Sequence, residues 1–238
     1  MQLKVLGFDT ATAATVVALL ADGQEPLEAR DDPAPGERPR HTTRLLALAR
    51  TLLDRARLAF GDLDLIAVGT GPGSFTGLRI GVATARALAQ ATGAPVAGVS
   101  TLRALAALPD DAGAETLVLP VVDARRGEVF VAGWRGGEEV FRPRAMTPAE
   151  LVELAEAGGA GERRPWLGVG DGAVRFRDVL VAAGVSVPDP GSPVHRVSAV
   201  TVCRLAAEAE PAPRRAVVPD YLRLPDAEEA LRARAEPG

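Results

Sequence analysis

The stretch Val68-Gly69-Thr70-Gly71-Pro72-Gly73-Ser74-Phe75-Thr76-Gly77-Leu78-Arg79 decides the fold of this chain. Residues 65–68, which lead into it, form a short apolar run with β-branched side chains and predict a buried strand. Residues 80–92, which follow it, are rich in Ala and Leu and predict a helix, with Ser74 or Thr76 as its N-cap. A glycine-rich turn between a strand and a helix N-terminus is either a tight connection or a site for an anion.

Two known phosphate-binding patterns fail on this loop. A Walker loop ends in Gly-Lys-Ser or Gly-Lys-Thr, and this loop has no lysine. The dinucleotide fingerprint requires a third glycine where Thr76 stands and an acidic residue about 20 positions further on. No Asp or Glu lies between Asp64 and Asp110. We therefore favour the tight connection, in which the glycines allow the helix to pack closely.

Small side chains recur at every fourth residue along the predicted helix, at Gly77, Gly81, Ala85 and Ala89. Residues with this spacing share one face of a helix. A face without bulky side chains lets another backbone approach closely. The approaching backbone belongs either to a helix of a partner protein or to the sheet of the same chain.

The composition is that of a folded protein that does not bind nucleic acid by bulk charge alone. Of its 238 residues 47% are hydrophobic, which is enough for a sizeable core, and the net charge is −4. The single cysteine, Cys203, excludes an internal disulfide, and its apolar helical context predicts buried packing. The first residues lack a signal-peptide pattern, and no apolar run approaches the roughly 20 residues of a membrane span. We therefore expect a cytoplasmic protein that does not bind membranes.

The order of predicted elements repeats. Residues 3–9 predict a strand that ends on Asp9, and residues 117–123 predict one that ends on Asp123. A turn, a returning strand, a hairpin, a third strand and a helix follow in both cases. The pattern predicts an α/β protein with two duplicated mixed-sheet domains and flanking helices. A polar break places the domains at 1–109 and 110–210, with a tail over 211–238 that is rich in proline and charge.

The first long helix is predicted over residues 41–59, with Thr42 or Thr43 as its N-cap. Its apolar face is wider than one contact with a sheet needs, because Leu46 and Leu53 extend it. Together with the glycine-containing helix, it is a candidate second surface for a partner.

Five stretches together resemble the TsaB (YeaZ) family. They are Phe8-Asp9-Thr10-Ala11-Thr12, the helix that starts at His41, Gly71-Pro72-Gly73-Ser74-Phe75-Thr76-Gly77-Leu78-Arg79-Ile80-Gly81, Asp123-Ala124-Arg125-Arg126-Gly127-Glu128-Val129-Phe130 and Pro219-Asp220-Tyr221-Leu222-Arg223. The stretch from Gly71 to Gly81 is the most specific, and the similarity covers nearly the whole chain. The resemblance implies the actin-like ATPase (ribonuclease H-like) fold, with two related halves around a cleft.

The resemblance also implies a function. The family acts in making threonylcarbamoyladenosine, the modified base beside the anticodon of tRNAs that read codons starting with A. Its members are non-catalytic partners of TsaD, which transfers the threonylcarbamoyl group from its adenylate to tRNA, and the ATPase TsaE joins the pair. This chain would then dimerise with TsaD, activate it, and meet tRNA indirectly through the complex. The partner surface that we expect on the first two helices comprises Leu45, Leu46, Leu53, Gly77, Leu78, Gly81, Val82 and Ala85.

The cleft implied by the resemblance is expected to be degenerate. Its candidate residues are Asp9, Thr10, Ser74 and Asp123. Phosphate-binding members of the fold place a glycine two residues after the acidic residue, where this chain has Ala11 and Arg125. Asp9 and Asp123 either cap their own turns or pair with a group across the cleft, and we favour the turn caps. Four arginines form a candidate local basic spot: Arg125, Arg126, Arg142 and Arg144.

We expect no catalytic residue, no metal and no cofactor. TsaD uses a His-x-x-x-His metal pair, whereas His41 and His195 lie far apart in this sequence. His41 is better explained as a terminal or capping residue than as a ligand. No nucleophile with a neighbouring base is visible.

Other classes of function stay open at this point. One is an enzyme: a small-molecule kinase of the same fold, or a protease, as an old label of the family suggests. Another is a homodimeric binding module, because the small-residue face could pair with the same face of a second copy when the partner is absent.

Overall fold

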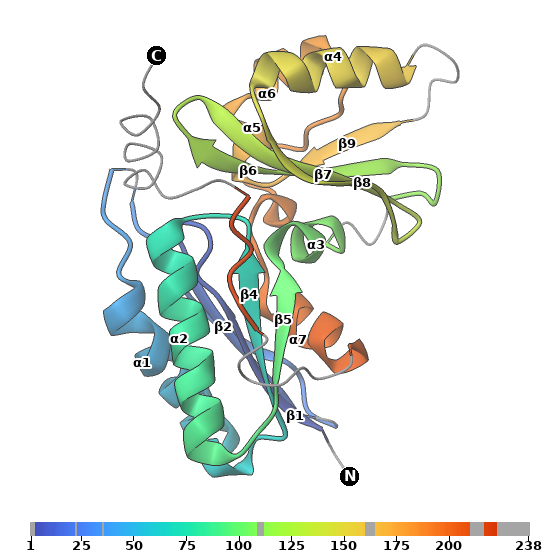
Figure 1. The fold of residues 1–238 in the computed structure, drawn as a ribbon. Helices are drawn as coiled ribbons and strands as arrows, with labels where there is room; N and C mark the ends of the chain where they lie inside the picture. Colours follow the sequence, from blue (N-terminus) through green and yellow to red (C-terminus); the bar gives the residue numbers. More distant parts are fainter. Residues whose placement is uncertain are drawn as a thin grey trace, which may run out of the picture.

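The computed structural model describes residues 3–21, 23–34, 36–108, 112–159, 165–209 and 217–222. Each half of the protein is built on its own mixed β-sheet (Figure 1). Residue 22 of the first predicted hairpin, residue 110 of the predicted domain boundary and most of the predicted tail lie outside the described residues.

The first half contains a five-stranded sheet with the order β3-β2-β1-β4-β5. The strands are β1 (Lys4–Asp9), β2 (Thr15–Ala21), β3 (Leu27–Asp31), β4 (Leu65–Gly71) and β5 (Val96–Ser100). β1, β2 and β3 pair antiparallel, whereas β4 pairs parallel with both β1 and β5. The nearly continuous apolar sequences of β1 and β4 are explained by burial on both faces of the sheet.

The second half repeats this arrangement with four strands in the order β8-β7-β6-β9. They are β6 (Leu117–Arg125), β7 (Glu128–Arg135), β8 (Glu138–Met146) and β9 (Trp166–Val169). β6, β7 and β8 pair antiparallel and β9 pairs parallel with β6, so the four strands match β1, β2, β3 and β4 in order and direction. The predicted duplication is confirmed, and with it the actin-like arrangement of two related halves.

Helices cover both sheets (Figure 1). They are α1 (His41–Ala56), α2 (Phe75–Thr92), α3 (Thr101–Ala106), α4 (Pro148–Gly159), α5 (Asp171–Arg175), α6 (Arg177–Ala182) and α7 (Ala199–Glu208), with short 3-10 turns at Phe60–Asp62 and Pro193–His195. α1 and α2 pack on one face of the first sheet, and α7 packs on the opposite face. α3 lies between the two sheets, and α4 to α6 cover the far face of the second sheet.

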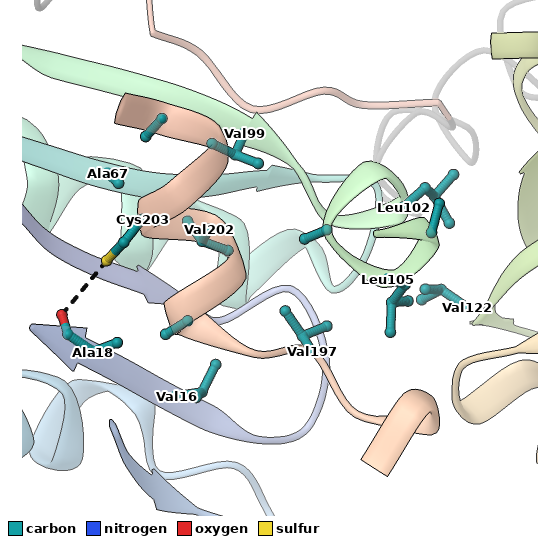
Figure 2. Packing of buried hydrophobic residues seen from close by; sticks show 14 of the residues in the cluster. Val16, Ala18, Ala67, Val99, Leu102, Leu105, Val122, Val197, Val202 and Cys203 are labelled. Carbon is teal, nitrogen blue, oxygen red and sulfur yellow. Dashed lines mark hydrogen bonds between the residues drawn. The ribbon is translucent and has the colours of Figure 1, made fainter. Parts of the chain in front are cut away.

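α7 follows the second sheet in the sequence, yet it packs on the first sheet. Gly7 of β1 makes this contact close, because an added Cβ there would lie 2.4 Å from the Cys203 sulfur of α7. The thiol lies 3.8 Å from the Ala18 carbonyl oxygen of β2 (Figure 2). Burial raises the pKa of Cys203, and its predicted role in packing is confirmed. The segment predicted as the second domain, 110–210, thus supplies a helix to the first sheet.

The ends of α1 differ from the prediction. The helix stops at Ala56 rather than at residue 59, because Arg57 takes a left-handed conformation with φ 58° and the Leu58 amide donates to the Leu53 carbonyl. Neither predicted threonine caps its start. Arg40 occupies the N-cap position, and the Thr43 hydroxyl donates to the Arg40 carbonyl oxygen instead.

Two short helices rather than one follow β9. Phe176 leaves helical geometry, with φ −109° and ψ 26°, and separates α5 from α6. Its ring packs against the apolar cluster under the second sheet. A capping box closes the start of α4: the Thr147 amide donates to the Glu150 carboxylate, and the Glu150 amide donates to the Thr147 hydroxyl.

Candidate functional site

The glycine loop between β4 and α2 is a tight connection. Ser74 is the N-cap of α2, because its Oγ accepts a hydrogen bond from the Gly77 amide at 3.3 Å. The Ser74 amide donates to the Ala11 carbonyl oxygen at 2.7 Å. An added Cβ at Gly73 would lie 2.3 Å from that same oxygen. The loop therefore holds the turn between β1 and β2 against the N-terminus of α2, and the favoured interpretation of the glycines is confirmed.

The small-residue stripe of α2 faces the sheet of its own half. An added Cβ at Gly77 would lie 1.9 Å from the Thr10 carbonyl oxygen, and one at Gly81 would lie 2.5 Å from the Thr10 hydroxyl. Ala85 and Ala89 continue the stripe and are fully buried. Of the two alternatives for this stripe, the structure selects the protein's own sheet.

The predicted partner surface is mostly core. Seven of its eight residues are buried: Leu45, Leu53, Gly77, Leu78, Gly81, Val82 and Ala85. Leu46 alone is exposed, at 48%. The prediction that these residues form an exposed surface is wrong for the other seven, because a stripe of small and apolar residues fits a neighbouring strand as well as a partner helix.

The outer faces of α1 and α2 carry a different set of side chains. Exposed residues of α1 include Thr43, Leu46, Ala47 and Arg50, and those of α2 include Thr76, Arg79, Ala83 and Ala87. We call these eight residues the outer helix face. It combines three alanines, one leucine and two threonines with two arginines.

Asp9 is a turn cap in a buried position. One carboxylate oxygen accepts from the Ala11 amide at 2.7 Å, and the other accepts from the Thr101 hydroxyl of α3 at 2.8 Å. Only 1% of Asp9 is exposed, and this burial raises the pKa of its carboxyl above the ordinary value, although both hydrogen bonds oppose the shift. Gly69 leaves the space for this carboxylate, since an added Cβ there would lie 1.9 Å from it.

Asp123 is a turn cap as well. Its carboxylate accepts from the Arg125 amide at 2.9 Å and from the Arg175 guanidinium of α5 at 2.7 Å. The Asp123 amide donates to the carboxylate of Asp171. The described partners of Asp123 all lie in the second half, and those of Asp9 are the Ala11 amide and the Thr101 hydroxyl. Within the part of the chain that the structure describes, neither carboxylate pairs with a charged group across the cleft, and the favoured prediction of turn caps is confirmed.

A cavity of about 590 Å³ lies between the two halves. Its wall in the first half comes from the turn after β1 and from residues 73–76, and its wall in the second half comes from the turn between β6 and β7 together with Asp171. Asp220, Tyr221 and Leu222 complete the lining. Of the four predicted cleft residues Ser74 and Asp123 line this cavity, whereas Asp9 and Thr10 are buried beneath its wall.

The sequence offered little signal for several cavity residues. Asp171 follows a strand within Gly170-Asp171-Gly172, which signals a turn but no role. Tyr221 lies on the Phe75 ring, with the ring centroids 4.9 Å apart, although 146 positions separate the two residues in the sequence. Only the fold could bring this pair together.

The two histidines serve the structure. His41 is buried, and its Nδ1 lies 2.9 Å from the Thr15 hydroxyl, while no described residue offers a hydrogen-bond partner to its Nε2. His195 places its ring nitrogens 3.2 Å and 3.0 Å from the carbonyl oxygens of Gly170 and Pro188. Among the described residues, no group of three or more His, Cys, Asp or Glu side chains is arranged to hold a metal ion.

Comparison with known proteins identifies the family. The family model for TsaD, tRNA N6-adenosine threonylcarbamoyltransferase, matches residues 37–184. The tRNA threonylcarbamoyladenosine biosynthesis protein TsaB of Escherichia coli is 32% identical over 93% of this chain and 95% of its own length. The chain belongs to the TsaB (YeaZ) family.

Further members support this assignment. TsaB of Bacillus subtilis is 30% identical and spans 95% of this chain and 96% of its own length. The solved structure of YeaZ from Pseudomonas aeruginosa superposes with a TM-score of 0.72 at 30% identity, covering 92% of this chain and all of that one. In the described part of this TsaB-family chain, no helix has the length and apolar character needed to cross a membrane.

Proposed function

We propose that this chain is the non-catalytic subunit that dimerises with TsaD and activates it, in the transfer of a threonylcarbamoyl group to the adenosine beside the anticodon of tRNA. Its membership of the TsaB family supports a role in this modification. The match of residues 37–184 to the TsaD model supports pairing between two related subunits. TsaE completes the proposed assembly.

The outer helix face is the surface that we propose pairs with TsaD. α1 and α2 lie side by side on one face of the first sheet, and the inner sides of both helices are used for the core. The outer side of α2 presents Ala83 and Ala87, one turn apart, and Leu46 is an exposed leucine on α1. Small side chains let a second helix backbone approach, and an exposed leucine gains from being covered.

The chemistry of the cleft supports the non-catalytic part of the proposal. The amides of Ser74 and Gly77 are already bonded within the chain, and the glycines around them contact the backbone of residues 10 and 11. Two of the amides that a phosphate-binding loop would offer to a phosphate are therefore already engaged. The carboxylates of Asp9 and Asp123 are likewise engaged in their own turns.

Substitutions on the outer helix face test the pairing. Leu46→Arg and Ala83→Arg place a large charged side chain on α1 and α2 at exposed positions, and we expect each to abolish co-purification with TsaD while the chain stays folded. Ala149→Arg, at an exposed alanine of α4 on the far side of the second half, is the matched control and leaves the complex intact. Unchanged capture of TsaD by both test variants would show that this face is not the interface.

Reconstitution tests the activation. tRNA modification is measured with TsaD and a supply of its adenylate, with and without this chain, and we expect the rate to depend on the chain. An equal rate in its absence contradicts the activating role. Light scattering with and without TsaD tests the homodimeric alternative. In that alternative the chain alone has the mass of a dimer, because a second copy covers the same face, and TsaD displaces this copy.

A further inference from the structure

The two helices that carry the outer helix face differ in charge from the rest of the chain. α1 and α2 together contain five arginines and one aspartate, although the whole chain has a net charge of −4. α2 itself contains no acidic residue. A partner that lies over these helices therefore gains from carrying acidic side chains where it meets them. The five arginines are Arg44, Arg50, Arg55, Arg79 and Arg86.

Three of these arginines are already engaged within the chain. Arg44 and Arg50 form ion pairs with aspartates at N–O distances of 3.1 Å and 2.8 Å. Arg86 donates to a backbone carbonyl oxygen of the segment 217–222. Within the described ranges, no carboxylate forms an ion pair with Arg55 or Arg79. Both of these side chains belong to exposed residues, so each can meet a carboxylate of a partner.

Arg79 differs from Arg55 because aromatic rings hold its guanidinium in place. Its guanidinium carbon lies 5.3 Å from the centroid of the Phe75 ring, one turn earlier on α2. Tyr221 packs on Phe75, with the ring planes 34° apart. We call this arrangement the Arg79 stack. A guanidinium that is held in this way loses little side-chain entropy when it forms further hydrogen bonds.

The segment that carries Tyr221 is itself fixed on the first sheet. Val217 is buried and packs in the apolar cluster beneath α1 and α2. The Asp220 amide donates to the Thr70 carbonyl oxygen of β4 at 2.7 Å. The segment runs beside α2, on the side of β5 (Figure 1). The Arg79 stack is thus supported from two parts of the chain that lie far apart in the sequence.

Exposed apolar side chains lie on both sides of α2. α1 covers β2 and β3, α2 covers β4, and the segment 217–222 lies over β4 and β5. Leu46 of α1 is 48% exposed, whereas Val218 and Tyr221 on the other side of α2 are 56% and 42% exposed. Arg79 lies on α2 between them. Arginine and tyrosine are enriched among the residues that dominate the binding energy of protein interfaces, and such residues are commonly surrounded by contacts that exclude water.

We propose that Arg79 is the anchor of the interface with TsaD, where its guanidinium forms a bidentate pair with a carboxylate of TsaD. This inference rests on the pairing proposed above and adds the chemistry of its central contact. The planar guanidinium offers two parallel N–H donors, which match a carboxylate better than a neutral polar group. The segment 217–222 becomes a third element of the interface beside α1 and α2, because Tyr221 supports the anchor.

The dissociation constant of the full chain and TsaD, measured by calorimetry, tests the anchor. We expect Arg79→Ala to weaken binding by at least about thirtyfold. Arg79→Lys keeps the charge but loses the planar pair of donors, and it should weaken binding by at least about tenfold. Arg55→Ala is the matched control, because it removes one exposed arginine from the last turn of α1, and its effect should stay within about threefold. Equal effects of Arg79→Ala and Arg55→Ala would overturn the proposal.

A double-mutant cycle tests the support from Tyr221. Tyr221→Leu should weaken binding by about fivefold, and the double variant with Arg79→Ala should bind at least about threefold more tightly than two independent effects would give. Independent effects would show that the stack does not hold the anchor. Unchanged melting temperatures of the single variants exclude unfolding as the cause of a loss.

Salt gives a second measurement of the same pair. Between about 0.05 M and about 0.5 M sodium chloride, binding of the wild type should weaken more steeply than binding of Arg79→Ala. Equal salt dependence of the two proteins contradicts a carboxylate partner. A wild type that does not bind TsaD would overturn the pairing itself, whereas normal binding by Arg79→Ala overturns the anchor alone.

Discussion

Thr10 and Gly77 hold each other in a reciprocal contact. The Thr10 hydroxyl donates to the Gly77 carbonyl oxygen at 2.8 Å, while the Thr10 carbonyl oxygen fills the space where a side chain at residue 77 would begin. The contact fixes the first turn of α2 on the turn that follows β1. It therefore sets the position of one of the two helices that carry the outer helix face.

Gly77→Ala should destabilise the protein strongly. An added Cβ would lie 1.9 Å from a backbone oxygen that cannot rotate away, so β1 and α2 must separate. We expect a loss of about 2 kcal/mol or more in the free energy of unfolding, measured with urea. Gly61→Ala is the control: no atom of the described residues lies within 4 Å of the added Cβ, and the change should stay within about 0.5 kcal/mol. Equal effects of the two substitutions would contradict this account.

The two faces of α2 should respond oppositely to a charge. Ala85→Arg buries an unpaired guanidinium against the sheet, because Ala85 is fully buried, and we expect it to cost more than about 4 kcal/mol or to prevent folding. Ala83→Arg, two residues earlier on the exposed face, should change the unfolding free energy by less than about 0.5 kcal/mol. Circular dichroism with urea unfolding distinguishes them. A folded Ala85→Arg variant of normal stability would mean that α2 is turned differently.

Asp9 should make the protein more stable as the pH falls towards its raised pKa. The folded state binds a proton more tightly than the unfolded state does, so protonation favours folding in the window from the raised pKa down to the ordinary value of 3.8. Asp9→Asn keeps an acceptor for the Ala11 amide and does not titrate. We expect the difference in stability, wild type minus Asp9→Asn, to increase as the pH is lowered from 7.5. A stability difference that stays constant between pH 7.5 and the ordinary pKa of 3.8 contradicts the raised pKa of Asp9.

His41 should have the opposite dependence. Burial lowers its pKa below 6.5, although Asp31 opposes the shift, and its ring lies at the N-termini of both α1 and α2, where the helix dipoles disfavour a positive charge. The unfolded state then binds the proton more tightly, so stability is lost as the pH falls from 6.5 towards the lowered pKa.

His41→Asn isolates this effect, because asparagine can bond Thr15 and does not titrate. We expect the stability of the wild type relative to His41→Asn to decrease between pH 7 and pH 5, by at most about 1.4 kcal/mol per pH unit. The measurement is urea unfolding of both proteins across this range. If the unfolding free energies of the two proteins change in parallel with pH, His41 has the same pKa in the folded and unfolded states, which contradicts the lowered pKa.

Local pattern was sufficient for much of the fold. The apolar run over residues 65–68 located β4, the runs that end on Asp9 and Asp123 located β1 and β6, and the Gly-rich stretch located the turn before α2. The duplicated strand that ends on Asp9 and on Asp123 gave the two halves. These features depend on neighbours in the sequence, which is why they can be predicted without a structure.

Features that depend on distant residues could not be predicted. Gly81 and Ala85 mark a close approach but do not say whether a strand or a partner makes it. The contact of Gly7 with Cys203 joins residues at opposite ends of the chain. The positive φ of Arg125 and Arg126 is equally hidden, because arginine is not a residue type that signals this conformation.

The late position of α7 has a consequence for synthesis on the ribosome. One face of the first sheet, which includes Gly7 and Ala18, receives its cover only when Ala199–Glu208 has been translated. This apolar face of the first sheet therefore stays exposed to solvent while the strands of the second half are being translated. Fragments that stop before residue 199 should consequently require a chaperone and accumulate as aggregates, whereas the full-length chain closes on itself.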